Sequence, residues 1–225
     1  MKKHIEAMKK AGVSLAIFAL ISVLLVAMTD QLTKRKIAEN KATMLLQVLN
    51  EVVPKDNYDN DLVKSKFTLP QKNKFANTPF QRDINVYLAT KNNQAVTAIF
   101  EVTTLQGYSG AITILVGVNA KDYTLSGVRV VQHKETPGLG DKMETRKSNW
   151  VLAFNNTSLN NPGIDGWQVK KDGGQFDQFT GATITPRAIV NAVKTTLLYA
   201  QDHMDVIFGA LNSGNDKKVI NNGNG

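Results

Sequence analysis

The chain has 225 residues, 42% of them hydrophobic, a length that suits one well-packed domain plus an anchor. It contains no cysteine, which excludes disulfides, thiolate nucleophiles, Cys-ligated iron–sulfur clusters and c-type haem, and its three histidines lack metal-binding spacing. The net charge of +8 is spread along the chain without a basic stripe interleaved with aromatics, which argues against nucleic-acid binding.

The first two segments have the composition of a membrane anchor. Residues 1–10 hold four lysines against one glutamate, and residues 11–28 (AGVSLAIFALISVLLVAM) carry no charge. At about 1.5 Å per residue, a helix of this length nearly matches a hydrocarbon core of about 30 Å. We therefore predict a cytoplasmic basic stub and a transmembrane helix. The alternative is a cleaved signal peptide, but the apolar run is longer than usual and no A-x-A site ends it.

The sequence indicates the orientation of the chain across the membrane only weakly. The basic stub lies before the span, and Lys34, Arg35 and Lys36 lie soon after it, so the charge rule favours a cytoplasmic N-terminus only slightly. A short basic stub before a first span usually stays inside. We therefore expect the rest of the chain on the periplasmic side of a bacterial inner membrane.

Residues 29–80 are interpreted as a stalk helix and a connection. Between Gln31 and Val53, apolar residues recur at three- and four-residue steps, which predicts an amphipathic helix that Pro54 ends. Residues 55–80 are polar and contain two prolines, so a partly irregular connection is expected.

The remaining pattern predicts an α+β domain over residues 81–211. Four β-rich runs separated by short turns favour an antiparallel sheet: 83–89, 95–103, 111–119 and 125–132. We expect a short helix over 143–154, a further strand over 167–170, and a last helix with Thr185 as N-cap and Pro186 as its first residue, running to about Leu211. This gives a mainly antiparallel sheet with flanking helices. Residues 212–225 have no apolar face and are predicted to be disordered.

The segment with the most chemical content is 177–187 (DQFTGATITPR), where a turn of small residues and threonines enters a helix. Free N–H groups and the positive end of the helix dipole stabilise a phosphate there, and Gly181 and Ala182 leave room for one. A phosphoester on Thr183 could rest near those amides. The same residues also suit ordinary capping, so composition and spacing alone leave both interpretations open.

A second segment, 133–142 (HKETPGLGDK), is a Pro/Gly turn that leaves a strand. It is not a P-loop, because no GK[ST] follows at the required spacing.

Together these segments resemble a known family. Residues 177–183 are similar to the D-x-x-[ST]-G-A-T flavinylation motif of the FMN-binding domain found in the G subunit of Rnf complexes and the C subunit of Na⁺-translocating NADH:quinone oxidoreductase. Residues 133–140 resemble the family's H-x-E-T-P-G-L-G segment. The likeness includes the anchor, the stalk and the GYSG turn at 107–110. Its details are closer to the Rnf protein, and the quinone oxidoreductase protein stays as the alternative.

The resemblance implies FMN joined through its phosphate to Thr183 by a flavin transferase that uses FAD, with Asp177 in the part of the motif that this enzyme reads. The other implied site residues are the surroundings of the attachment point, Thr180, Gly181, Ala182 and Thr185, and the ring contacts Glu135, Thr136, Gly138, Leu139 and Gly140. Trp150 and Trp167 could flank a flavin, but plain core is the favoured interpretation.

The resemblance further implies a redox subunit without substrate turnover of its own. It would relay electrons between NADH and ferredoxin-type carriers, beside the other subunits of an ion-translocating membrane complex. No catalytic acid–base pair and no metal site are expected. Two alternatives from other classes stay open, a cofactor-free membrane scaffold and an independent extracytoplasmic reductase.

Overall fold

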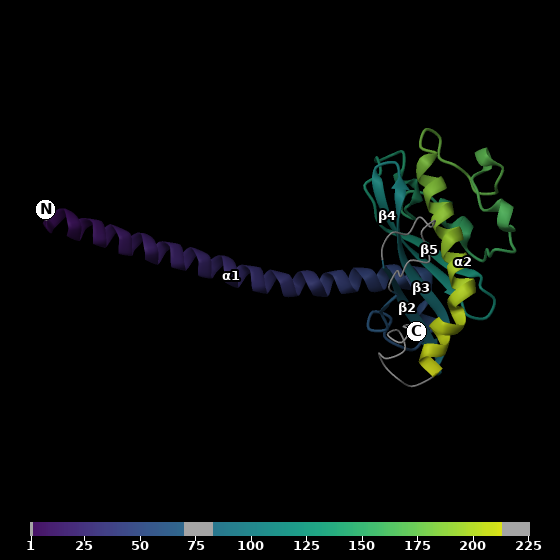
Figure 1. Ribbon diagram of the computed structural model, residues 1–225, viewed down its shortest axis with the longest axis horizontal. Helices are drawn as coiled ribbons and strands as arrows, with labels where there is room; N and C mark the ends of the chain where they lie inside the picture. The colour runs from purple at the N-terminus through teal and green to yellow at the C-terminus, as the bar shows by residue number, and fades with distance from the viewer. Residues whose placement is uncertain (1, 70–82, 213–225) are drawn as a thin grey trace, which may run out of the picture. The chain divides into compact units, whose positions relative to one another are not determined.

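The computed structural model describes residues 2–69 and 83–212. Within them the chain forms two α-helices, a five-stranded sheet and short 3-10 turns (Figure 1). The elements are α1 (Lys2–Val52), η1 (Lys55–Asn57), β1 (Phe67–Leu69), β2 (Ile84–Lys91), β3 (Gln94–Gly107), β4 (Gly110–Asn119), β5 (Leu125–Gln132), η2 (Asp141–Met143), η3 (Trp150–Phe154), η4 (Ile164–Gly166), η5 (Lys170–Asp172) and α2 (Ile184–Asn212). They divide into two compact units, one up to Leu45 and one from Leu46 onward.

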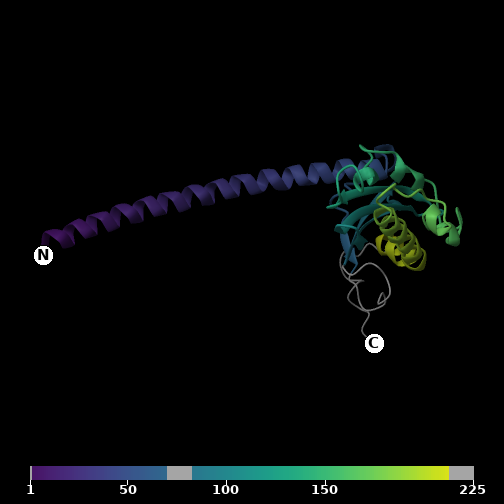
Figure 2. The same cartoon turned by 90° about the horizontal axis from the view of Figure 1, so that it is seen from above.

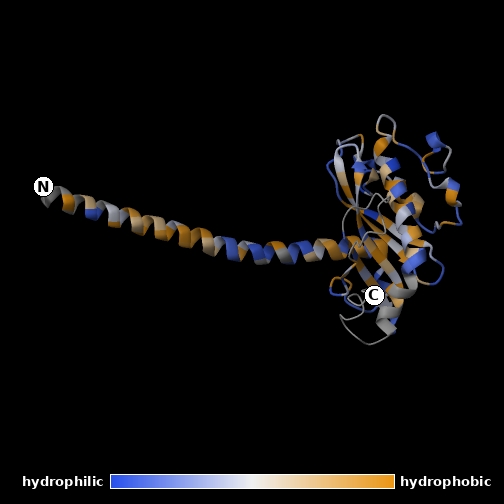
Figure 3. Ribbon diagram, in the orientation of Figure 1, coloured by the Kyte–Doolittle hydropathy of each residue, from blue (hydrophilic) through white to orange (hydrophobic). Residues whose placement is uncertain are grey.

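The first unit is the greater part of α1, which joins the two helices expected over 11–28 and 31–53. It contains a window of mean hydropathy 2.6. Large apolar side chains in this stretch are exposed, among them Leu15, Phe18 and Leu24, and polar turns follow the apolar stretch (Figure 3). The helix is long and apolar enough to cross a membrane. It ends at Val52 because Pro54 cannot continue it.

The second unit is built on an antiparallel sheet in which each strand pairs with its neighbour in sequence, in the order β1-β2-β3-β4-β5. The predicted antiparallel sheet is confirmed, and the four β-rich runs correspond to β2, β3, β4 and β5. The first strand, β1, lies in the segment assigned to an irregular connection. It pairs with β2 through Phe67 opposite Val86.

Helix α2 covers one face of this sheet (Figures 1 and 2). Alternate residues of the strands point to that face and form the main core with the apolar stripe of the helix. Phe100 of β3, for example, meets the Tyr199 ring of α2 edge to face at 6.2 Å between centroids. The buried members of this core include Val86, Leu88, Phe100, Val102, Ile114, Val116, Ile189, Val193 and Leu197.

The end of α1, from Leu46 onward, packs on β4 and β5 at two glycines. A Cβ added to Gly117 would lie 2.5 Å from Val52 Cγ1, and one added to Gly127 would lie 3.2 Å from the Val52 carbonyl oxygen. Arg129 Nε of β5 also donates to Glu51 Oε2 at 2.8 Å. The glycines therefore allow the helix end to approach the strands closely.

Between β5 and α2 the chain winds through 3-10 turns around stacked aromatic rings. The helix predicted over 143–154 is wrong, because η2 and η3 are separate turns. Ser148 Oγ donates to the Lys142 carbonyl at 2.6 Å and accepts from Trp150 N at 3.2 Å, and such side-chain bonds compete with helical ones. The strand predicted over 167–170 is also wrong. Only Val169 makes a β-bridge there, with Phe176, because η5 and the left-handed Gly173 (φ 90°) reverse the chain.

The last helix, α2, ends at Asn212, one residue beyond the expected end. The predicted disorder of 212–225 therefore falls, apart from Asn212, outside the described residues, as do residues 70–80 of the predicted connection.

Candidate functional site

The two motif segments meet at a cavity of about 250 Å³. Its lining residues are Tyr108 from the β3–β4 hairpin, Glu135, Thr136, Leu139 and Gly140 from the loop after β5, and Gly181, Ala182, Thr183 and Ile184 from the start of α2. Ligand pockets commonly have volumes of about 300–1,000 Å³, so this cavity would enclose only part of a nucleotide-sized ligand. The ETPGLG and TGAT segments, about 50 residues apart in the sequence, thus line a single site.

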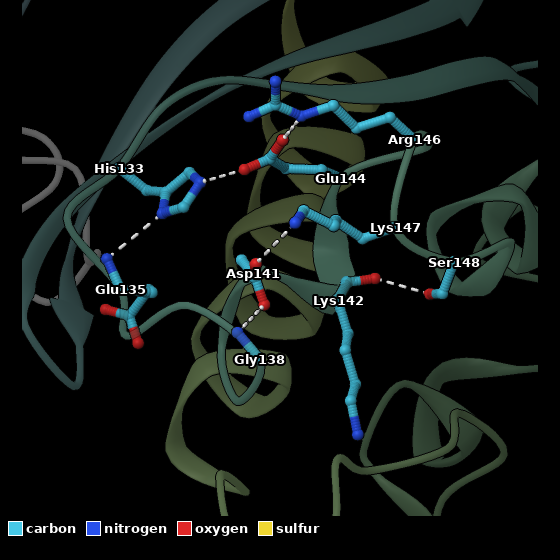
Figure 4. Close-up of polar contacts among 9 residues, drawn as sticks. All are labelled: His133, Glu135, Gly138, Asp141, Lys142, Glu144, Arg146, Lys147 and Ser148. Carbon is cyan, nitrogen blue, oxygen red and sulfur yellow. Dashed lines mark hydrogen bonds and ion pairs between the residues drawn. The ribbon is translucent and has the colours of Figure 1, made fainter.

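One wall of the cavity is the loop 133–148, shown in Figure 4, which is held by bonds within itself. The Thr136 carbonyl accepts from the amides of Leu139 and Gly140, both at 3.1 Å. The Gly138 amide donates to Asp141 Oδ1 at 2.7 Å, and the φ of +79° at Gly138 favours glycine. The ETPGLGD sequence therefore folds into a defined turn.

A hydrogen bond between His133 and Glu144 joins the start of this loop to its later part (Figure 4). The Glu135 amide donates to His133 Nδ1 at 3.1 Å, so the ring proton lies on Nε2, which is 2.8 Å from Glu144 Oε1. Hydrogen bonds from Arg146 and His133, with the Arg146 bond as the larger cause, lower the pKa of the Glu144 carboxyl below its usual range. This carboxyl therefore stays ionised and keeps both partners.

Glu135 is buried, with 5% of its surface exposed, and it connects three segments. Its Oε1 accepts from the Ser109 amide at 2.8 Å, and its Oε2 accepts from the Thr185 hydroxyl at 2.5 Å. The hairpin, the loop and the start of α2 are thus joined through one carboxylate.

At the opposite wall, α2 begins at Ile184, and the Thr183 carbonyl accepts the first helical bond from the Arg187 amide at 3.3 Å. Thr183 is therefore the N-cap, and the prediction that Thr185 has this role is wrong. Thr185 lies in the first turn because its buried hydroxyl is bonded to Glu135. The Thr183 hydroxyl is half-buried and has no hydrogen-bond partner in the part of the chain that the structure describes. It lies where the first amides of the helix and its dipole favour an anion.

The turn before Thr183 is fixed by contacts with other segments. Trp150 Nε1 donates to the Asp177 carbonyl at 2.7 Å, and Lys170 Nζ lies 2.6 Å from Asp177 Oδ1. The Phe179 ring is buried 4.9 Å from the Trp150 ring, and the Phe179 carbonyl accepts from the Ala182 amide at 3.1 Å. The TGAT turn is thus attached to the core.

Several residues predicted from the sequence do not line the cavity. They are Thr180 and Asp177, which are exposed, Gly138, which shapes the loop, and Thr185, which lies behind Glu135. Sequence reasoning missed Tyr108 and Ile184 as lining residues. The GYSG turn was the available signal for Tyr108, and Ile184 directly follows the TGAT motif.

The two tryptophans do not line this cavity, and Trp167 is 2% exposed. They belong to an aromatic cluster beneath the TGAT turn, with Trp150 5.3 Å from the Phe154 ring and Phe154 4.6 Å from the Phe176 ring. A larger cavity of about 510 Å³ shares only Ile184 with the first. The motif residues therefore gather at the smaller one.

Two family models match this chain. The FMN-binding domain model matches residues 107–198, which include every residue that lines the smaller cavity, and the model for the RnfG N-terminal region matches residues 1–52. The crystal structure of NqrC from Shewanella oneidensis aligns with a TM-score of 0.46 at 20% identity, over 69% of this chain and 75% of that one.

Relatives at much higher identity share one description, the G subunit of an ion-translocating oxidoreductase complex. The protein from Pseudoalteromonas atlantica is 47% identical over 205 residues, covering 90% of this chain and 93% of that protein. The one from Photorhabdus laumondii is 48% identical over 197 residues, covering 88% and 92%. The one from Vibrio cholerae is 45% identical over 199 residues, covering 88% and 93%. The chain therefore belongs to the RnfG family, the G subunits of ion-translocating oxidoreductase complexes.

Proposed function

We propose that this chain is a membrane-anchored flavoprotein subunit and carries FMN esterified through its phosphate to the Thr183 hydroxyl. The observation that carries this proposal is the cavity itself. The cavity lies within the region that matches the FMN-binding domain, and both Thr183 and the ETPGLG loop line it. The Thr183 hydroxyl has no hydrogen-bond partner among the described residues.

The chemistry of the lining fits a flavin nucleotide. The start of α2 offers N–H groups and a dipole for the phosphate, next to the hydroxyl that would form the ester. Gly181 carries no side chain, so the backbone there is approachable, while Tyr108 and Leu139 offer aromatic and apolar surface for a ring. FMN, when bound, supplies the exchange of one or two electrons, and these residues supply its position.

The small volume of the cavity explains why a covalent bond would be needed to retain the cofactor. A site of about 250 Å³ leaves part of the nucleotide outside, so noncovalent affinity is limited. The part of the nucleotide outside the cavity would be accessible to partner subunits for electron exchange. The tether keeps the cofactor in a place from which it would otherwise diffuse away.

The anchor and its orientation complete the proposal. The exposed apolar side chains of α1 suit lipid, and the lysines of residues 1–10 favour a cytoplasmic N-terminus. The FMN domain would then lie in the periplasm at the inner membrane, beside the other subunits of the complex. There it would relay electrons between NADH and ferredoxin-type carriers while the complex moves ions.

Attachment itself requires a separate flavin transferase. Thr183 Oγ1 would bond to the flavin-side phosphorus of FAD and lose its proton, while the phosphoanhydride bond of FAD breaks and AMP leaves. Asp177 is exposed and outside the cavity, so a modifying enzyme can reach it without entering the site.

Intact-mass measurement tests the attachment. The full chain is produced with and without a flavin transferase, as the parent, as Thr183→Val and as the matched control Thr195→Val, whose hydroxyl bonds to the Asn191 carbonyl within α2 and which lies outside the cavity and outside the TGAT motif. We expect one FMN on the parent and the control and none on Thr183→Val. An unmodified mass for the parent made with the transferase, without flavin fluorescence after denaturation, would leave the cofactor-free scaffold as the better interpretation.

The orientation has its own test. Protease added to spheroplasts should digest the domain that follows α1. Protection of this domain until the membrane is broken would place it in the cytoplasm.

A further inference from the structure

The Glu135 carboxylate connects the two walls of the cavity, and it is also the charged group of the lining. We propose that Glu135 is a positioning residue that holds the two walls together and whose negative charge lowers the reduction potential of the bound flavin. This inference rests on the FMN attachment proposed above.

The hydrogen bonds show the positioning role. Ser109 belongs to the hairpin that carries Tyr108, and Thr185 belongs to the first turn that Thr183 caps. Each donates to a different oxygen of Glu135. If the carboxylate is removed, the start of α2 loses its bond to the ETPGLG loop, and the Thr185 hydroxyl is left buried without this acceptor.

Two glycines enclose the Glu135 side chain. A Cβ added to Gly107 would lie 2.9 Å from Glu135 Oε1, and one added to Gly140 would lie 2.7 Å from Glu135 Cβ and 2.9 Å from Oε2. Neither glycine has a positive φ, so their absent side chains, rather than their backbone angles, make the space. The Glu135 side chain is therefore confined between the hairpin at Gly107 and its own loop at Gly140.

The electrostatic role follows from the same bonds. Both oxygens accept hydrogen bonds, and no cation of the described chain forms an ion pair with Glu135. Among the cavity's lining residues, all of which the structure describes, Glu135 is the only Asp, Glu, Lys, Arg or His. A negative charge in this poorly solvated place opposes the addition of an electron to a neighbouring ring, although the α2 dipole offsets part of it.

Glu135→Gln separates charge from geometry. The glutamine oxygen can accept from the Ser109 amide, and its NH₂ group can donate to Thr185, whose hydroxyl then accepts. The bonds between the walls survive and the charge is lost. Thr185→Val does the opposite, since it breaks one of the bonds and keeps the charge.

Glu101→Gln is the matched control. Glu101 Oε2 accepts from Asn85 Nδ2 at 2.9 Å and from the Tyr87 hydroxyl at 3.1 Å, and this residue does not line the cavity. Glu101→Gln therefore removes a carboxylate of similar bonding from strand β3, outside the cavity.

The experiment measures three quantities on the full chain in detergent: the FMN-loaded mass, the melting temperature of the unmodified chain, and the midpoint potential of the loaded chain. We expect Glu135→Gln to keep full FMN loading and to shift the potential upward, while Glu101→Gln leaves it unchanged. Glu135→Ala and Thr185→Val should lower the melting temperature and the fraction of chain that carries FMN. The Thr185→Val molecules that do carry FMN should show no upward shift in midpoint potential.

Three results would overturn the proposal. An unchanged potential in Glu135→Gln removes the electrostatic role, and an equal upward shift in Thr185→Val assigns the shift to geometry. Full loading and stability in Glu135→Ala remove the positioning role. Failure of the proposed function is distinct, because the parent chain itself would then gain no FMN mass.

Discussion

The two walls of the cavity are held in different ways. The loop 133–148 is fixed largely by bonds among its own residues, such as Thr136 with Gly140 and His133 with Glu144. The turn 177–183 is fixed by partners outside it, Trp150 and Lys170, and by burial of Phe179 in the aromatic cluster. The first wall therefore carries its geometry in its own sequence, whereas the second depends on the core beneath it.

The difference indicates how each wall responds to substitution. Changes in the core should reach the attachment wall and leave the loop's own bonds in place, whereas changes in the loop should act locally except at Glu135 and Gly140, which contact Thr185 of α2. Four substitutions test this contrast.

The largest effect is expected from Phe154→Ala. The Phe154 ring is fully buried and stacks on Phe176 beneath the attachment wall, so its loss should cost about 3–5 kcal/mol of unfolding free energy. Urea unfolding of the full chain in detergent measures this cost. Leu198→Ala on the exposed side of α2 is the control and should stay within about 0.5 kcal/mol. Equal costs for the two variants would contradict the role of the cluster.

Gly140→Ala tests the contact between the walls. The new methyl group would lie 2.7 Å from Glu135 Cβ and 3.1 Å from Thr185 Oγ1, so we expect a loss of about 1–3 kcal/mol and a lower fraction of FMN-loaded chain. Gly138→Ala is a useful comparison because its Cβ meets nothing within 4 Å, and only its positive φ is strained. Parent-like loading of Gly140→Ala would show that the walls can move apart without loss.

Trp150→Phe tests the attachment wall alone. Phenylalanine keeps an aromatic ring against Phe179 but removes the bond from Nε1 to the Asp177 carbonyl, which should cost about 1 kcal/mol. Lys170→Gln breaks the exposed ion pair to Asp177 and should cost less than that. Denaturation midpoints of the two variants show which substitution costs more stability. The reverse order would mean that the exposed ion pair, and not the indole bond, holds Asp177.

The smallest effect, and one that depends on pH, is expected from Glu144→Gln in the loop. Because the folded-state pKa of Glu144 is lowered, its contribution to stability is fully present above the ordinary pKa of a glutamate, about 4.3, and is lost as the pH falls through the lowered value. The difference between parent and variant should therefore be greatest at neutral pH and vanish in acid. Unfolding free energies from pH 7 down to pH 3 measure it, and a difference that grows in acid would reverse the assignment.

The sequence predicted those parts of the fold that depend on local patterns. The alternation within β2 to β5 located the antiparallel sheet, because side chains of a half-buried strand must alternate. Pro54 likewise located the end of α1. The three-residue β1 was missed because it is too short to show a pattern.

The errors lie where side-chain hydrogen bonds, and not the apolar pattern, decide the local structure. The hydroxyl of Ser148 redirects the backbone between η2 and η3, and the bond from Thr185 to Glu135 places Thr185 inside α2 instead of at its cap. Similarly, the sequence named Glu135 as a ring contact without indicating its bonds to Ser109 and Thr185, which come from hairpin and helix.

The chain order of the sheet has a consequence for the order of assembly. Strands β2 to β5 pair in the order in which they occur along the chain, so they close short loops at low entropic cost. The bond between Glu135 and Thr185 joins residues 50 positions apart and needs α2 in place. We therefore expect pulsed hydrogen exchange during refolding to protect β3 and β4 before the first turns of α2, and the opposite order would refute this. A modifying enzyme that requires the finished cavity would then act only on chains that have completed folding.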